Sequence, residues 1–144
     1  MFKGFAIVAV VLTATGTCSA QRWQQLYLPL AGSQLPCRLM KPINFDASQK
    51  YPVILSLHGA GGKGTDNRKQ LKVWNGQLAA KAVRIKFPCY ILAPQADGLW
   101  NERHFKQIKE TIKRLPAVDM DRIYVLGHSM GGHCLLYTSD AADE

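Results

Sequence analysis

The chain has 144 residues, enough for one domain at most, and its formal net charge at pH 7 is +8. The basic residues are scattered and accompany no nucleic-acid motif, so they indicate a solvated basic surface rather than a nucleic-acid interface; attraction to acidic polymers stays open. The sequence shows no Cys, His and carboxylate spacing of a metal site, and it implies no cofactor.

Residues 1–20 have the pattern of a secretory signal. A lysine near the start precedes the apolar residues 5–12, which are too few to span a bilayer, and small residues precede a cleavage site after Ala20. We therefore expect a secreted or periplasmic protein without a transmembrane helix after cleavage. Lipid anchoring through Cys18 is the alternative, but the preceding residues fit a lipobox poorly.

The last residues, 134–144, resemble no protein family. They resemble the translated end of a transposon-based sequencing adapter, which predicts a non-native tail. Residues 21–133 then form the N-terminal part of a larger domain. Within that part the pairing of Cys37 and Cys89 is open: a disulfide and a buried free thiol both fit an exported protein.

The predicted elements alternate between strands and helices. Two apolar segments, 25–30 and 35–40, flank a turn and predict an antiparallel hairpin at a sheet edge. Residues 51–57 are nearly all apolar, as in a strand buried on both faces. The later elements are a helix including 69–73, a helix around 76–83, a strand over 89–93, a helix from Asn101 that Pro116 ends, a turn at 119–121 and a strand over 122–126. This order predicts an α/β fold on a mainly parallel sheet with helices on both faces.

The strand over 122–126 runs into the motif G-x-S-x-G at residues 127–131. This pattern is typical of a nucleophile elbow, in which Ser129 stands at the apex of a sharp strand-to-helix turn. Small flanking residues leave room for that turn, and the N–H of Met130 would face an oxyanion. A tight turn with an idle serine is the alternative.

A glycine-rich loop, residues 58–64, follows the strand over 51–57. Such a loop lets the backbone approach a ligand closely. Neither complete phosphate-binding motif, G-x-x-x-x-G-K-[ST] or G-x-G-x-x-G, is present, so the pattern favours an oxyanion loop.

Together these segments resemble the α/β-hydrolase superfamily, and more narrowly the exported esterases related to polyhydroxybutyrate depolymerases and to feruloyl and acetyl-xylan esterases. The segments are YPVILSLHGAGGKGTDN, FPCYILAPQ with a following tryptophan, and VDMDRIYVLGHSMGG. The resemblance implies that Ser129 attacks an ester carbonyl and that the backbone N–H groups of Ala60, Gly61 and Met130 hold the oxyanion. It also implies an acid and a histidine base after Gly132, so the parent protein would be an enzyme and the fragment inactive.

Other residues of the motifs have weaker assignments. The resemblance gives His58 a structural role, and His104, His128 and His133 are expected to be non-catalytic. Trp100 either lines the substrate pocket or packs under a loop. We expect a serine carboxylic-ester hydrolase acting on polysaccharide-linked or polyester substrates. A serine peptidase, an acyltransferase of the same fold and a catalytically silent binding module are the alternatives.

Overall fold

The computed structural model describes residues 23–133. The predicted signal, residues 1–20, and the predicted tail, residues 134–144, lie outside this part of the chain. Within it, no helix combines the length and the apolar character that crossing a bilayer requires.

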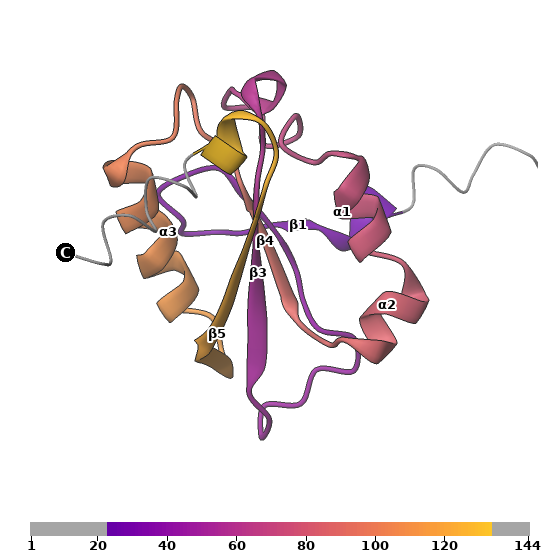
Figure 1. The fold of residues 1–144 in the computed structure, drawn as a ribbon. Helices are drawn as coiled ribbons and strands as arrows, with labels where there is room; N and C mark the ends of the chain where they lie inside the picture. The colour runs from indigo at the N-terminus through magenta and orange to yellow at the C-terminus, as the bar shows by residue number, and fades with distance from the viewer. Residues whose placement is uncertain (1–22, 134–144) are drawn as a thin grey trace, which may run out of the picture.

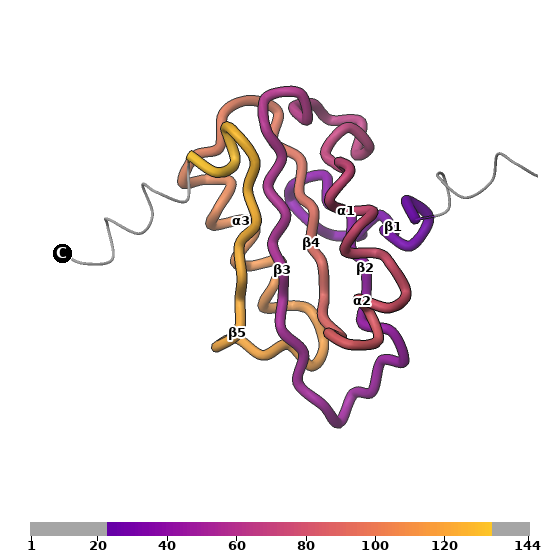
Figure 2. Tube along the Cα trace, turned by 45° about the vertical axis from the view of Figure 1, so that its right-hand side comes forward, coloured from indigo at the N-terminus to yellow at the C-terminus, as the bar shows by residue number. Residues whose placement is uncertain are grey.

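A five-stranded sheet forms the centre of the molecule, with the strand order β1-β2-β4-β3-β5. Figure 2 shows the strands side by side, from β5 through β3 and β4 to β2. β1 and β2 pair antiparallel, as do β2 and β4, whereas β3 lies parallel to both β4 and β5. The strands are β1 (Leu28–Pro29), β2 (Cys37–Met40), β3 (Tyr51–Leu57), β4 (Tyr90–Pro94) and β5 (Val118–Gly127). The predicted mainly parallel sheet with an antiparallel edge hairpin is confirmed.

Helices cover both faces of this sheet, as predicted. In Figure 1 the sheet is seen nearly edge-on, with α3 on one side and α1 and α2 on the other. The helices are α1 (Val73–Leu78), α2 (Lys81–Lys86) and α3 (Glu102–Lys113), with short 3₁₀ turns η1 (Trp23–Leu26) and η2 (Ala60–Gly62).

The period of two in a strand divides the core into two layers. Val53 and Leu55 of β3 are buried in the layer that includes Ile108 and Ile112 of α3. Ile54 packs into the other layer, together with Leu78 of α1. Both faces of β3 are therefore covered, which is why its sequence reads as a continuous apolar run.

The predicted helix over 69–73 does not form, and α1 begins only at Val73. The Asp66 carboxylate accepts the N–H groups of Arg68 and Lys69, as a helix cap would. However, Asn67 has a φ of 52°, which a right-handed helix excludes. Long-range hydrogen bonds of Asn67 hold this conformation, and sequence periodicity does not report such bonds.

The predicted turn at 119–121 lies inside β5. Tyr51 pairs with Val118 and Val53 pairs with Ile123, so residues 119–122 bulge out of the ladder. The strand is consequently longer than the sequence predicted, and its final part still leads straight into the elbow.

Cys37 and Cys89, whose pairing the sequence left open, are both free thiols. Cys37 is buried in β2, and this burial raises the pKa of its thiol to about 11. The protonated thiol therefore behaves as a small apolar side chain.

Candidate active site

Ser129 occupies the turn that the G-x-S-x-G pattern predicts. β5 ends at Gly127, and a short helical turn starts at Met130. Ser129 between them has a φ of 52°, a left-handed conformation that is costly for any residue with a Cβ. Its side chain is exposed. The elbow geometry is present; the role of Ser129 as the nucleophile stays a prediction.

The glycines beside Ser129 are required by close packing. A Cβ on Gly127 would lie 2.5 Å from the carbonyl carbon of Gly131, and a Cβ on Gly131 would lie 2.7 Å from the carbonyl oxygen of Leu57. A side chain at Gly127 would push the helical turn after Ser129 away from the end of β5, and one at Gly131 would push that turn away from the end of β3. These contacts are the physical reason for the small residues in the motif.

The glycine-rich loop after β3 lies directly against the elbow. A Cβ on Gly59 would lie 3.3 Å from the Cβ of Ser129. The turn η2 is closed by hydrogen bonds from the N–H of Gly62 to the carbonyl of Gly59 (2.9 Å) and from Lys63 to Ala60 (3.3 Å). The N–H groups of Ala60 and Gly61 precede these bonds, so the turn itself does not use them. They are two of the three backbone donors that the resemblance assigns to the oxyanion hole; the third is the N–H of Met130.

His58 supports this loop and has no free ring nitrogen for base catalysis. The N–H of Ala96 donates to Nε2 of His58 (3.0 Å), so Nε2 is the unprotonated nitrogen. Nδ1 then carries the proton and donates it to the carbonyl of Gly59 at 2.7 Å. Burial lowers the pKa of His58, which keeps the ring neutral.

Trp100 is buried beneath the same loop. Its indole N–H donates to the carbonyl of His58 (3.1 Å), and its ring centroid lies 4.8 Å from that of the His58 ring. It belongs to the core layer under α3. A contribution of Trp100 to a substrate pocket stays a prediction.

His104, in the first turn of α3, is buried although it is a polar residue of an amphipathic helix. Its Nε2 lies 3.4 Å from the Asp97 carboxylate, and its ring packs edge-on against Trp100. Helical spacing did not predict this burial, because both partners, Asp97 and Trp100, lie in the loop between β4 and α3.

Trp74 is a neighbour of the elbow that the sequence analysis missed. Its ring lies 5.4 Å from the ring of His128, which precedes Ser129, and its indole N–H donates to Ser56 Oγ (2.9 Å). The adjacent Lys72 ammonium donates to the carbonyl of Gly61 (3.0 Å). No local pattern links α1 to the elbow, so the fold was needed to find these contacts.

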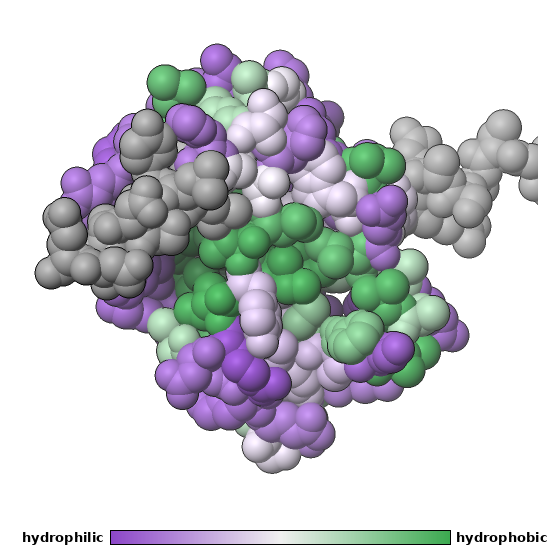
Figure 3. Space-filling view, viewed as in Figure 1, coloured by the Kyte–Doolittle hydropathy of each residue, from purple (hydrophilic) through white to green (hydrophobic). Residues whose placement is uncertain are grey.

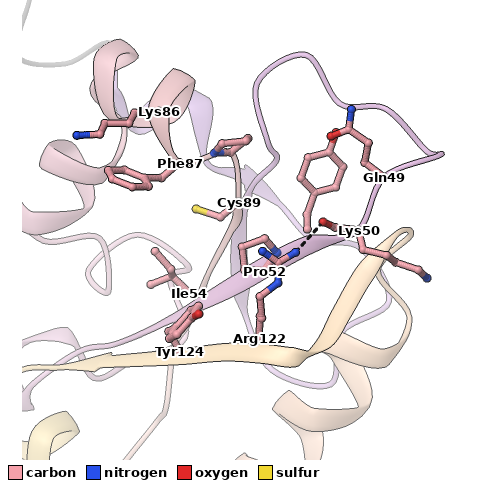
Figure 4. A pocket seen from close by; sticks show the side chains of 11 residues that line it. Gln49, Lys50, Pro52, Ile54, Lys86, Phe87, Cys89, Arg122 and Tyr124 are labelled. Carbon is pink, nitrogen blue, oxygen red and sulfur yellow. Dashed lines mark hydrogen bonds between the residues drawn. The ribbon is translucent and has the colours of Figure 1, made fainter.

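A groove of about 630 Å³ lies away from the elbow, beside the N-terminal half of β3 (Figure 4). Its apolar floor includes Pro52, Ile54 and Tyr124, and Lys50 and Lys86 lie among its lining residues. None of the predicted site residues lines this groove. Figure 3, which has the same view as Figure 1, shows apolar side chains gathered across the middle of the molecule, over the edge of the sheet where β5 lies.

No family model matches the chain. A probable dipeptidyl-aminopeptidase B of Arthroderma gypseum is 32% identical over 124 residues, covering 74% of this chain and 13% of that protein. A dipeptidyl-peptidase 5 of Schizosaccharomyces pombe is 27% identical over 141 residues, covering 88% of this chain and 20% of that protein. The chain therefore spans only a small part of the length of these relatives.

A solved structure, described as a thermostable esterase, matches with a TM-score of 0.65 and 27% identity. The match covers 76% of this chain and 36% of that chain. The strand order, the elbow at the end of β5 and these similarities place the described residues in the α/β-hydrolase superfamily.

Proposed function

We propose that the polypeptide is a serine hydrolase that cleaves carboxylic esters, with Ser129 as its nucleophile. The observation that carries this proposal is the left-handed backbone of an exposed serine at the end of β5. In an open parallel sheet, ligands bind beside the carboxyl ends of the strands, and Ser129 follows such an end. The strain at Ser129 persists because close glycine contacts hold the elbow, and such strain is concentrated at functional sites.

The reaction proceeds in two steps. Ser129 Oγ attacks the ester carbonyl carbon while a base takes its proton, and collapse of the tetrahedral intermediate releases the alcohol, which receives that proton. Water then attacks the acyl-enzyme with the same base, releases the carboxylic acid and restores the serine. The resemblance implies that the parent protein supplies this base as a histidine, paired with an acid, from beyond Gly132.

The N–H groups of Ala60, Gly61 and Met130 bind the oxyanion of both intermediates. Two of them come from η2 and one from the start of the helical turn after Ser129, so they approach from two elements that pack against each other. Removing a donor of this kind costs about 3–4 kcal/mol of transition-state stabilisation.

Within ester hydrolysis we propose esters carried by polysaccharides or polyesters as the substrate class. The resemblance of the motifs to exported esterases and the signal pattern of residues 1–20 support this choice. The likeness to a thermostable esterase supports ester cleavage in general.

Peptide cleavage is the second candidate, and the names of the relatives support it, since they are a dipeptidyl-aminopeptidase and a dipeptidyl-peptidase. The acyl-enzyme chemistry is the same for both classes. The leaving group differs, because an amine leaves only after protonation by the histidine, whereas an alcohol is a better leaving group.

The test compares p-nitrophenyl acetate and butyrate with a dipeptide p-nitroanilide. It uses the full-length polypeptide, meaning the parent protein and not the 144-residue chain. We expect ester turnover, reduced by about 10³-fold or more in kcat/KM by Ser129→Ala. Ser48→Ala, which changes an exposed serine in the loop before β3, is the matched control and keeps full activity. Preferential cleavage of the dipeptide anilide would favour the second candidate, and full ester turnover by Ser129→Ala would reject Ser129 as the nucleophile.

A further inference from the structure

Gln95, immediately after β4, is fully buried and joined by its side chain to the loop that follows β3. Its Nε2 donates to the carbonyl of Gly62 (3.0 Å) and to the Asp66 carboxylate (2.9 Å). Its Oε1 accepts the N–H of Asn67 at 2.6 Å. Two donors and one acceptor are matched by partners of the opposite kind, so this network fixes the orientation of the amide.

The backbone of Gln95 and Ala96 also forms hydrogen bonds, and those of Ala96 reach the same loop. The N–H of Ala96 donates to Nε2 of His58, and the carbonyl of Ala96 accepts the N–H of Gly64 at 3.0 Å. The N–H of Gln95 donates to the carbonyl of Pro36, which ties this segment to the approach to β2. The oxyanion turn η2 therefore lies between two attachments, one at His58 and one at Gly62.

The bond from Gln95 to Asp66 is reinforced by charge. The N–H groups of Arg68 and Lys69 also donate to this carboxylate, and these hydrogen bonds, with the one from Gln95, hold the pKa of Asp66 well below its usual range. The acceptor is thus ionised under ordinary conditions, and hydrogen bonds to an ionised acceptor are shorter and stronger than neutral ones.

We infer that Gln95 is a positioning residue that sets the oxyanion hole by holding the carbonyl of Gly62. The same Gly62 closes η2 through its N–H to Gly59, so its carbonyl fixes how the turn is rotated. That rotation decides where the N–H groups of Ala60 and Gly61 point. This inference rests on the proposed function, since a hole is needed only where an oxyanion forms.

The geometry of such a hole is demanding. Donors have to lie close to 3 Å from the oxyanion, and a displacement of about 1 Å costs on the order of 100-fold in rate. Loss of the Gln95 side chain would free the carbonyl of Gly62 at the end of η2. The turn would then be held by His58 at its beginning and by the exposed Lys72 ammonium at the carbonyl of Gly61. Contacts with the substrate away from the reacting carbonyl would change little. We therefore expect the loss of Gln95 to lower kcat and to leave KM unchanged.

The variant Gln95→Met keeps the length of the side chain and removes all three hydrogen bonds. Gln70→Met is the matched control, because Gln70 is equally buried and its Nε2 donates to Asn67 Oδ1 and to the carbonyl of Ala93, not to η2. Gln95→Glu keeps the acceptor but places an oxygen opposite the Asp66 carboxylate. The introduced carboxyl regains a donor only when it is protonated.

Two readouts are combined, both far below the melting temperature. Hydrogen exchange of peptides covering residues 58–66, without substrate, reports the order of the loop, and ester kinetics report kcat and KM. We expect Gln95→Met to exchange faster and to lose about 10- to 100-fold in kcat at unchanged KM. Gln70→Met is expected to lower the melting temperature without either change. For Gln95→Glu, the kcat relative to that of the unaltered polypeptide should rise as the pH falls.

The outcomes separate this inference from the proposed function. Turnover that Ser129→Ala abolishes but Gln95→Met leaves unchanged would overturn the positioning role alone. Equal losses of kcat and equal exchange in the two methionine variants would also overturn it, because that result indicates general destabilisation. Turnover that survives in Ser129→Ala would overturn the proposed function and, with it, the role of Gln95.

Discussion

Gly62 and His58 show how single residues shape the oxyanion turn. A Cβ on Gly62 would lie 2.5 Å from both Cβ and Cγ of His58, well inside contact distance. A Cβ on Gly61, the preceding residue, would meet no atom within 4 Å. The two glycines are alike in the sequence and differ only in what the fold places against them.

We therefore predict that Gly62→Ala lowers the free energy of unfolding by about 1–3 kcal/mol, the usual cost of overpacking. Gly61→Ala should change the free energy of unfolding by less than about 0.5 kcal/mol. Urea unfolding followed by tryptophan fluorescence measures both. Equal stability of the two variants would show that His58 moves aside without cost.

The buried imidazole of His58 gives a second prediction at this scale. Burial lowers its pKa in the folded state below the ordinary value of 6.5, so below pH 6.5 the unfolded chain binds a proton that the folded chain does not. The free energy of unfolding should fall as the pH drops below about 6.5, with a slope of at most about 1.4 kcal/mol per pH unit from this group.

His58→Gln removes this titration and leaves the other histidines in place. The difference in slope between the two proteins, from urea unfolding at several pH values, isolates His58. The carboxylates with lowered pKa, including those of Asp66 and Asp119, affect a separate window near and below pH 4. Identical slopes in the two proteins would contradict the neutral assignment of His58.

The residues of the site were predictable to different degrees. Ser129 and its flanking glycines were found because the motif is contiguous and each residue answers a local steric demand. Gln95 and Trp74 were not found, because their hydrogen bonds reach partners that are distant in the sequence. A single buried glutamine belongs to no repeating apolar pattern, so one sequence alone does not predict its burial or its partners.

At the scale of elements, α3 was predicted because its information is local. The Asn101 side chain accepts the N–H of His104 and so caps the first turn, and the buried Ile108 and Ile112 lie on one face. The sequence likewise predicted a helix over 69–73, but none forms there, because hydrogen bonds to Cys37 of β2 and to Gln95, just after β4, hold Asn67 in a left-handed conformation. Tertiary contacts overrode a local preference there.

The cap of α3 can be tested directly. Asn101→Ala should lower the free energy of unfolding by about 1 kcal/mol. Asn101→Ser should lower it by much less, because a serine hydroxyl can accept the same N–H. Urea unfolding of both variants measures the difference. If the alanine variant were as stable as the serine variant, the hydrogen bond at 3.2 Å would contribute nothing to the helix.

At the scale of the whole molecule, β5 is an edge strand of the sheet in the described residues. Three consecutive apolar or aromatic residues near its end are exposed, namely Tyr124 at 57%, Val125 at 39% and Leu126 at 38%. An unpaired apolar edge offers free backbone donors and acceptors to another chain.

We predict that the 144-residue chain self-associates through this edge, as light scattering after size-exclusion chromatography would detect. Tyr124→Lys should reduce the association, because a lysine on an edge opposes strand pairing. Leu99→Lys adds the same charge at another exposed position, 70% accessible, and should leave association unchanged. A monomeric chain, or equal effects of the two lysines, would contradict the role of the edge.

The central claim is that Ser129 is an activated nucleophile, and covalent labelling tests it most directly. The full-length polypeptide would be treated with a fluorophosphonate, which phosphonylates catalytic serines, and digested for mass spectrometry. We predict that the label is found on the peptide containing Ser129 and disappears in Ser129→Ala. A Ser129 that stays unmodified, with or without a label elsewhere, would contradict it.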